Sequence, residues 1–330
     1  MRARSSAHPA PPIVALVLTA LLAALPLLLG ASRSVMSVAV GILVLAAYAV
    51  AFHLVFAGTG QLMLCVGGLA GLAAYTATLL ADRAGIAVFV AVPLATVLAA
   101  CVGAALSWVC VRRRLDTIFV GVVTLAFSLM VTNLLVGGGQ PTGAETGLFV
   151  TAGAQGPLRD WIGAYYVFLA VLVGFLAVHR AIDRSRLGWA CRAISDDPHA
   201  AELAGVPVAR TKVLVAAVAS AMLGLAGALH ALHEGFVSPS TYAFAAVDVR
   251  VLVAVAIGGT GTLAGPVVGA LGLGLIDELL RPLGQLRLTV YGAVLLIVFL
   301  GMRSGVVPVL TRYRRHPRPQ DDARRVRPDA

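Results

Sequence analysis

The sequence predicts an all-α polytopic membrane protein, with about ten transmembrane helices in one bundle and one short helix outside the membrane. Of its 330 residues, 59% are hydrophobic and only 12% are charged, and the mean hydropathy is +0.93. A soluble globular chain carries about 25% charged residues, so this chain lacks the polar side chains that a water-facing surface needs. Several of its apolar runs also reach the roughly 20 residues with which a helix crosses a bilayer.

The apolar runs set the expected domain limits. A polar segment, 1–12, precedes a membrane-spanning region, 13–302, and a polar, arginine-rich tail that we expect to be disordered, 303–330. The expected spans are 13–30, 35–57, 62–81, 86–111, 118–136, 163–178, 213–232, 247–280 and 288–302. The first run exceeds the 7–15 apolar residues of a secretory signal, so we expect it to remain as a span.

The run 247–280 is too long for one span and is interrupted by glycines. Gly258 to Gly261 and then Gly265-Pro266 break it near the middle. Irregular backbone at membrane depth is tolerated only where protein or an aqueous cavity satisfies its polar groups. We therefore expect two helices joined by a tight glycine turn.

The basic residues predict the orientation, because basic loops stay on the cytoplasmic side. If the amino terminus is cytoplasmic and each run crosses once, the cluster 112–114, the basic loop 179–212 and the tail all lie inside, provided that 247–280 crosses twice. This arrangement gives ten spans with both termini cytoplasmic. The net charge of +10 then reflects topology, and no nucleic acid partner is expected.

Motifs for catalysis are absent from the sequence. There is no Walker A sequence, G-x-S-x-G elbow or G-x-G-x-x-G, so we expect no enzyme, no ATP hydrolysis by this chain and no cofactor. His230, His233 and Glu234 match no zinc-protease pattern, and no metal site is predicted. Asp248 and Asp277 lie near the ends of apolar runs, where we expect their carboxylates to reach the interface.

The loop 179–212 contains a short helix with both ends specified. Asp196 and Asp197 precede Pro198, which gives an acidic N-cap with proline at the first helical position. Gly205 is suited to ending the helix in the left-handed conformation. A helix of two turns is not stable alone, so we expect it to dock against a partner.

At this loop the sequence resembles the membrane permeases of branched-chain amino acid ABC importers, of the LivM type. The matching stretch runs from Ser185 to Gly205 and continues with Lys212 and the small-residue segment 224–229. The resemblance implies that this loop is the coupling segment that docks on the ATPase. The residues carried over to it are Arg192, Ala193, Asp196, Asp197, Ala200, Ala201 and Gly205. Replacing Ala201 with a bulky charged residue is expected to abolish uptake and leave the protein in the membrane.

Three further stretches resemble the same family, in the same order along the chain. They begin at Gly60-Gln61-Leu62, at Val123-Thr124-Leu125-Ala126-Phe127 and at Ser238-Pro239, the last continuing to Gly258–Pro266. The resemblance suggests candidate pathway-lining residues, namely Gln61, Tyr75, Thr124 and Phe127. The chain departs from the family after Gln61, where Met63-Leu64-Cys65-Val66 replaces the usual Ser-Leu-Gly-His, and this departure bears on the substrate more than on the fold.

The resemblance implies a permease subunit of an ABC importer for branched-chain or other small hydrophobic amino acids, in a bacterial plasma (inner) membrane. The implied partners are two cytoplasmic ATPase subunits, a companion permease in a heterodimer and an extracytoplasmic substrate-binding protein, besides the lipid bilayer. Two alternatives stay open. An ion-coupled secondary transporter would need carboxylates in mid-span, and a permease of the same family could carry a sugar or urea-like solute.

Overall fold

The computed structural model describes residues 33–139, 142–151 and 158–281. The expected first and last spans and the basic tail lie outside these residues. The described helices are α2 (Arg33–Thr59), α3 (Val66–Asp82), α4 (Val88–Arg112), α5 (Thr117–Gly137), α6 (Trp161–Arg184), α7 (Arg186–Asp196), α8 (Pro198–Leu203), α9 (Val208–Glu234), α10 (Asp248–Gly258) and α11 (Gly265–Leu279). Two short strands, β1 (Leu148–Phe149) and β2 (Phe236–Val237), pair antiparallel between the 3₁₀ turns η1 (Ala144–Thr146) and η3 (Pro239–Tyr242).

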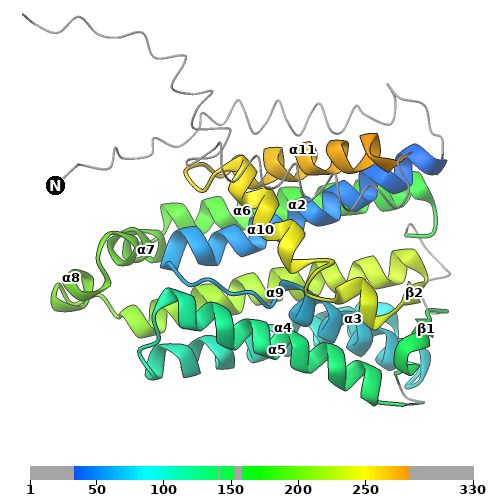
Figure 1. The fold of residues 1–330 in the computed structure, drawn as a ribbon, viewed down its shortest axis with the longest axis horizontal. Helices are drawn as coiled ribbons and strands as arrows, with labels where there is room; N and C mark the ends of the chain where they lie inside the picture. Colours follow the sequence, from blue (N-terminus) through cyan, green and yellow to red (C-terminus); the bar gives the residue numbers. More distant parts are fainter. Residues whose placement is uncertain (1–32, 140–141, 152–157, 282–330) are drawn as a thin grey trace, which may run out of the picture.

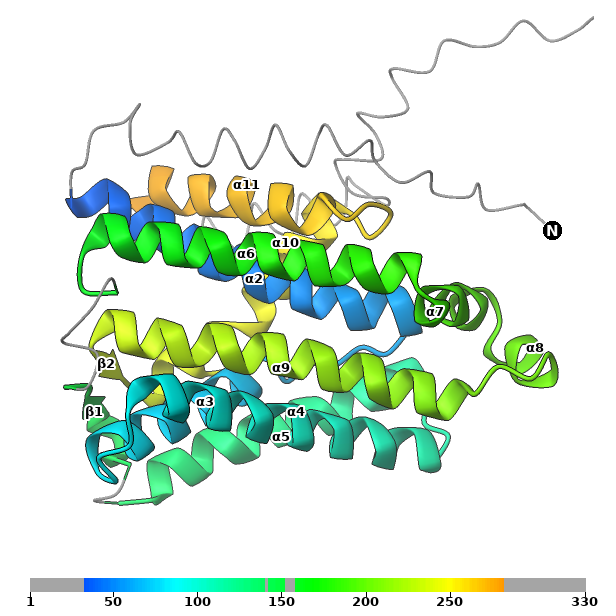
Figure 2. The same ribbon diagram turned by 180° about the vertical axis from the view of Figure 1, so that it is seen from behind.

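The chain is an all-α membrane protein apart from the two-residue strand pair. Among the described residues, five helices are long and apolar enough to cross a membrane: α2, α4, α5, α6 and α9. Each of them covers one expected apolar run. In Figures 1 and 2 the long helices lie side by side, and α7 and α8 project at one end.

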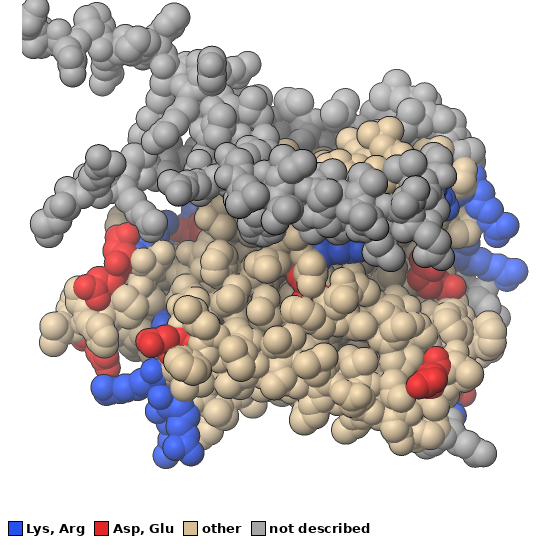
Figure 3. All heavy atoms as spheres, viewed as in Figure 1, with Lys and Arg blue, Asp and Glu red and all other residues tan. Residues whose placement is uncertain are grey.

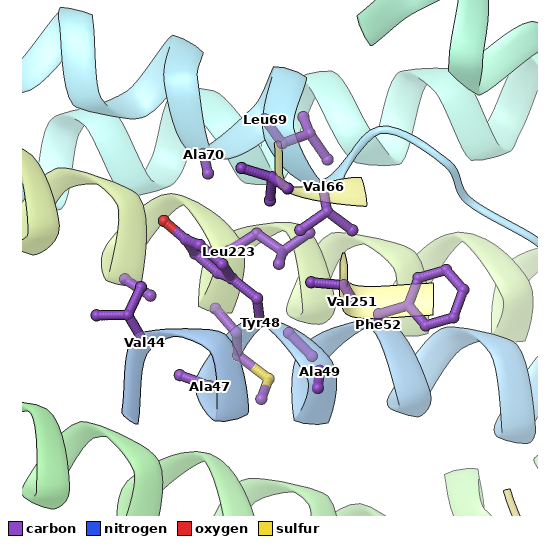
Figure 4. Packing of buried hydrophobic residues seen from close by; sticks show 14 of the residues in the cluster. Val44, Ala47, Tyr48, Ala49, Phe52, Val66, Leu69, Ala70, Leu223 and Val251 are labelled. Atoms are coloured by element: carbon purple, nitrogen blue, oxygen red, sulfur yellow. The ribbon is translucent and has the colours of Figure 1, made fainter. Parts of the chain in front are cut away.

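The core is built around α2, which is buried along most of its length because other helices cover it on all sides. It packs against α6, α9, α10 and α11. In Figure 4, Tyr48 and Phe52 of α2 lie among Leu223 of α9, Val251 of α10 and the first turns of α3, and all four named side chains are under 6% exposed. The helix α2 is therefore the central helix of the described bundle.

Small residues let α9 approach its neighbours closely. A Cβ on Gly224 would lie 2.6 Å from the Cβ of Ala99 in α4, and one on Gly227 would lie 2.7 Å from the Cα of Ala70 in α3. Such contacts replace the hydrophobic effect, which does not drive association between helices in lipid. The small residues therefore pack α9 closely against α3 and α4.

Three helices are shorter than the runs that predict them. The run 62–81 becomes helical only at Val66, and the run 247–280 divides into α10 and α11 around the turn 259–264. At 1.5 Å per residue, the 11 residues of α10 extend only about 17 Å, about half of the hydrocarbon core. The expected glycine-joined helix pair is confirmed, but α10 is a half-length helix.

The surface separates charge from apolar residues along the helix axes. In Figure 3, the Lys, Arg, Asp and Glu side chains gather mainly at the two ends, and the band between them carries few charges. α4 and α5 contribute large exposed apolar side chains to the outside, including Phe89, Val97, Phe119, Val122 and Leu134. An apolar band of this kind suits a lipid-facing surface.

Candidate functional site: an interrupted helix and a projecting helical segment

The segment Gly60–Cys65, which precedes α3, is not helical although it lies inside the bundle. Side chains of neighbouring helices satisfy its backbone. The Leu64 N–H donates to Thr124 Oγ1 at 2.8 Å, and the Thr117 hydroxyl donates to the Gly60 carbonyl at 2.9 Å. Thr124 is 1% exposed. Two threonines of α5 thus replace the hydrogen bonds that a continuous helix would have supplied.

Gln61 is the polar side chain that this break places in the interior. It is 2% exposed, and its Oε1 accepts a hydrogen bond from Ser107 Oγ of α4 at 3.2 Å. The Thr59 hydroxyl, at the end of α2, is 3.4 Å from the same oxygen. The amide therefore joins α2, α4 and the interrupted segment at one point.

Asp248, at the start of α10, caps the interrupted helix from 181–182 residues away in the sequence. Its Oδ1 accepts from the Val66 N–H at 2.6 Å and its Oδ2 from the Gly67 N–H at 3.1 Å, the first amides of α3. The residue is 1% exposed. The expectation that this carboxylate reaches the interface is wrong, because the unsatisfied N–H groups at the start of α3 bind it within the bundle.

A small apolar hollow adjoins the break. It is lined from α2 by Phe52 and Val55, from the interrupted segment by Met63 and Cys65, and from α9 by Leu223. Met63 and Cys65 belong to the stretch that departs from the family pattern, and both are at most 5% exposed. The residues that differ from the family pattern therefore form an apolar side of the hollow.

The structure brings two of the four candidate pathway residues together. Gln61 and Thr124 both contact the segment Gly60–Cys65, whereas Tyr75 lies further along α3, where its hydroxyl is 3.4 Å from the Val237 carbonyl of β2. Phe127 of α5 is partly buried against the core. Sequence reasoning missed Asp248 as a site residue, and its only signal was an acid between Ser238-Pro239 and Gly258–Pro266.

Hydrogen bonds and close packing attach α7 to the end of α6. Ser185 caps α7, its Oγ accepting from the Leu187 N–H at 3.2 Å and donating to the Ile182 carbonyl at 2.7 Å. Gly188 packs against this corner, where an added Cβ would lie 2.6 Å from the Asp183 carbonyl oxygen. Arg192 Nη1 donates to the same carbonyl at 3.2 Å. Movement of α7 would therefore carry the end of α6 with it.

The caps of α8 are those that the sequence predicts. Asp197 Oδ1 accepts from the His199 and Ala200 N–H groups at 2.8 and 3.1 Å, and Pro198 occupies the first turn. The hydrogen bonds from Ala200 and His199 lower the pKa of the Asp197 carboxyl. Gly205 has φ +83°, in the left-handed region that favours glycine.

The two sides of α8 differ in what they present. Ala201 is 4% exposed and faces its own chain, its carbonyl accepting from the Val206 N–H at 3.0 Å. Leu203 is 92% exposed, and Trp189 on α7 is 70% exposed, with the Arg192 guanidinium 4.7 Å from its ring centroid. Because Ala201 is buried, a bulky replacement there would disturb the segment itself. The exposed apolar side chains are the ones free to meet a partner.

The remaining carried-over residues lie on the same segment. Arg192, Asp196 and Ala200 are exposed and Ala193 is half-buried. At the other end of the bundle, His230 Nε2 lies 3.7 Å from Glu234 Oε1, and His233 Nδ1 lies 2.9 Å from the Leu158 carbonyl oxygen. Among the described residues, no group of three or more His, Cys, Asp or Glu could hold a metal ion.

Comparison with known proteins places the chain among permeases. A family model, the permease component of branched-chain amino acid transport systems, matches residues 34–302. The chain is 28% identical over 277 residues to the high-affinity branched-chain amino acid transport system permease protein LivM of Escherichia coli K12, covering 76% of this chain and 64% of that one, and equally so to LivM of Salmonella typhimurium. It thus spans under two thirds of the length of these relatives.

A second kind of relative matches a shorter part. The chain is 29% identical over 143 residues to the permease protein LivH of Escherichia coli K12, which covers 43% of this chain and 46% of LivH. No solved structure matches the chain.

Proposed function

Because the chain belongs to the family of branched-chain amino acid transport system permease components, we propose that it is the transmembrane permease subunit of an ABC importer for branched-chain or other small hydrophobic amino acids. Its LivM and LivH relatives are permease proteins of branched-chain amino acid transport systems. Energy for uptake would then come from separate ATPase subunits, as an ABC importer requires.

The observation that carries this proposal is the projecting segment formed by α7 and α8. It stands beyond the bundle (Figure 1), it is fixed to α6 by the Ser185 cap and the close approach of Gly188, and it exposes Leu203 and Trp189. Two large apolar side chains held outside the bundle suit a surface that is covered by another protein. We assign that surface to a cytoplasmic ATPase.

The orientation follows from the same assignment. The helix ends nearest α7 carry the cluster Arg112–Arg114 and most basic residues of the loop 179–212 (Figures 1 and 2), and basic residues mark the cytoplasmic side. The three short helices and the two expected spans outside the described residues would complete ten helices in one bundle. Segments 1–12 and 303–330 would then both be cytoplasmic.

The pathway is assigned to the break before α3. Gln61 and Thr124 would supply polar groups there, and the hollow beside it is lined mainly by apolar side chains. In this conformation the hollow is too small for a leucine side chain, so the route would have to widen to pass a small hydrophobic amino acid. Tyr75 and Phe127 would border the route further along. A companion permease would form the other half of the pathway, and an extracytoplasmic binding protein would deliver the solute.

The test is uptake of leucine by the assembled transporter after replacement of Leu203 with glutamate. Leu203 is almost fully exposed, so the replacement should leave the chain inserted and its thermal unfolding unchanged, while uptake falls at least tenfold because the ATPase no longer docks. Glu202→Gln is the matched control, since Glu202 is an exposed neighbour on the same helix and its variant should transport normally.

Three results would count against the proposal. Full uptake by the Leu203→Glu variant would remove the docking role of α8. Uptake by the chain alone, driven by a proton gradient without ATPases, would favour the secondary transporter instead. Competition of leucine uptake by a sugar or by urea would favour a permease of the same family for such a solute.

A further inference from the structure

Three side chains, two of them buried, form a hydrogen-bonded series between the end of α6 and the turn that joins α10 to α11. His179 Nδ1 lies 3.2 Å from Asp183 Oδ2, His179 Nε2 lies 3.2 Å from His53 Nδ1, and His53 Nε2 lies 3.2 Å from the Thr260 carbonyl oxygen. Both imidazoles are at most 6% exposed, whereas the Asp183 side chain is 50% exposed. The series therefore leads from water to the glycine turn through α2.

The three hydrogen bonds of this series need three N–H hydrogens on the two imidazole rings. Its two ends, the Asp183 carboxylate and the Thr260 carbonyl, can only accept hydrogen bonds. His179 Nδ1 and His53 Nε2 must therefore each carry a hydrogen, and the central contact needs a third hydrogen on one of the two facing nitrogens. Two neutral imidazoles supply only two N–H groups. All three hydrogen bonds exist together only when the pair holds one extra proton.

The extra proton belongs on His179, which contacts the carboxylate that balances its charge. His53 is then neutral, with its hydrogen on Nε2. The titratable groups in hydrogen-bond contact with the two rings are the rings themselves and Asp183. On α7, Arg192 donates to the Asp183 carbonyl, and burial raises the pKa of Cys191 to about 11, so that its thiol stays neutral.

We propose that this series is a proton-dependent link that holds the glycine turn when His179 is charged and releases it when His179 is neutral. On deprotonation one proton leaves to water, and each ring keeps one. The hydrogen of His179 stays on Nδ1, against the carboxylate, because that bond is charge-assisted. The hydrogen of His53 moves from Nε2 to Nδ1 to fill the central contact, and the bare Nε2 then faces the Thr260 oxygen.

The hydrogen bond to the Thr260 carbonyl is the one that breaks, because this carbonyl can bind water instead. Thr260 is exposed, and it lies in the turn after Gly258 and Gly259, so its carbonyl can rotate toward water. The charge state of a side chain on α6 thereby decides whether the turn between α10 and α11 is tied to α2. The link lies at the same end of the bundle as α7 (Figures 1 and 2).

Nitrogen-15 NMR of the purified full chain, labelled at histidine, tests the link from about pH 5 to about pH 9, a range that brackets ordinary histidine titration. The nitrogen shifts distinguish the two neutral tautomers from the cation. We expect His53 to remain neutral and to change tautomer with the same midpoint at which His179 loses its charge. A His53 that keeps its hydrogen on Nε2 throughout the titration of His179 would overturn the proposal.

Variants separate the link from a merely structural contact. His179→Gln should abolish the tautomer change of His53. His230→Gln should preserve it, and this control is matched, since His230 also pairs with a carboxylate four residues along its helix. Hydrogen exchange of residues 258–265, corrected for its intrinsic pH dependence, should be slower at low pH in the wild type and independent of pH in His179→Gln. A tautomer change that persists in His179→Gln would contradict the link, and the wild-type titration decides even if that variant does not fold.

Discussion

Two aspartates cap two helices of this molecule, and they do so under opposite conditions. Asp197 lies directly before α8, and its carboxylate accepts the amides of residues two and three positions ahead while exposed to water. Asp248 caps α3 from another part of the chain, and it is buried among α3, α10 and the bundle core. The chemistry is the same, an anion at the positive end of a helix.

The difference lies in what would replace the carboxylate if it were lost. Water can reach the amides at the start of α8, so the cap there adjusts the order of an exposed segment. Water has little access to the amides of Val66 and Gly67, so the cap there satisfies groups that have no other partner. The first aspartate therefore tunes a docking surface, and the second permits a helix to begin inside the bundle.

The largest effect is expected from Asp248→Leu, which removes the buried cap. Two amides of α3 would lose their acceptor, and an unsatisfied buried donor costs about 1–3 kcal/mol, so we expect a loss of roughly 2–4 kcal/mol. Thermal unfolding of the purified protein in detergent measures it. Asp248→Asn keeps one acceptor oxygen and should lose about half as much, and wild-type stability in the leucine variant would contradict the capping role.

Gly67→Ala tests the same place by steric means. A Cβ at this position would meet the Tyr242 carbonyl oxygen and, at 2.9 Å, Asp248 Oδ2. Because backbone cannot move aside cheaply, we expect destabilisation of about 1–3 kcal/mol, seen in the same unfolding experiment. Gly41→Ala in α2 is the control, since a Cβ there meets nothing within 4 Å, and equal effects at the two sites would refute the argument from packing.

The two caps also show which features of the fold can be predicted from the sequence and which cannot. The cap, the proline and the left-handed glycine of α8 are local, so the nine residues from Asp197 to Gly205 predict them. The apolar runs predict the long helices for the same reason. The start of α3 at Val66 depends on Asp248 and Thr124, which lie 182 and 58 positions further on, and the exposure of Leu203 against the burial of Ala201 depends on how α8 folds back on the chain. Spacing along the sequence carries no record of such contacts.

Gly205→Ala is expected to have a smaller effect, confined to the projecting segment. Its φ of +83° is unfavourable for residues with a Cβ, by about 1–2 kcal/mol, but no atom lies within 4 Å of the added carbon. Hydrogen exchange should accelerate in residues 197–205, and the midpoint of global thermal unfolding should stay unchanged. A shift of the global midpoint would show that α8 is part of the cooperative core, contrary to the contrast drawn with α3.

The smallest effect is the pH dependence of the α8 cap. The amides of Ala200 and His199 lower the pKa of Asp197 in the folded segment, so the unfolded segment binds a proton more readily. The carboxylate therefore adds order to α8 fully above the ordinary aspartate pKa of about 3.9. That contribution is lost as the pH falls through the lower folded value, so hydrogen-exchange protection of α8, corrected for intrinsic rates, should decline below about pH 4.

Asp196 is the matched control for this prediction, because it precedes Asp197, carries the same charge and is also exposed. Asp197→Asn should weaken protection of the His199 and Ala200 amides at neutral pH and flatten its dependence on pH, whereas Asp196→Asn should leave both as in the wild type. Equal behaviour of the two variants would mean that net charge, and not a directed hydrogen bond, orders α8. The cap would then resemble a general field effect, and the parallel with Asp248 would no longer hold.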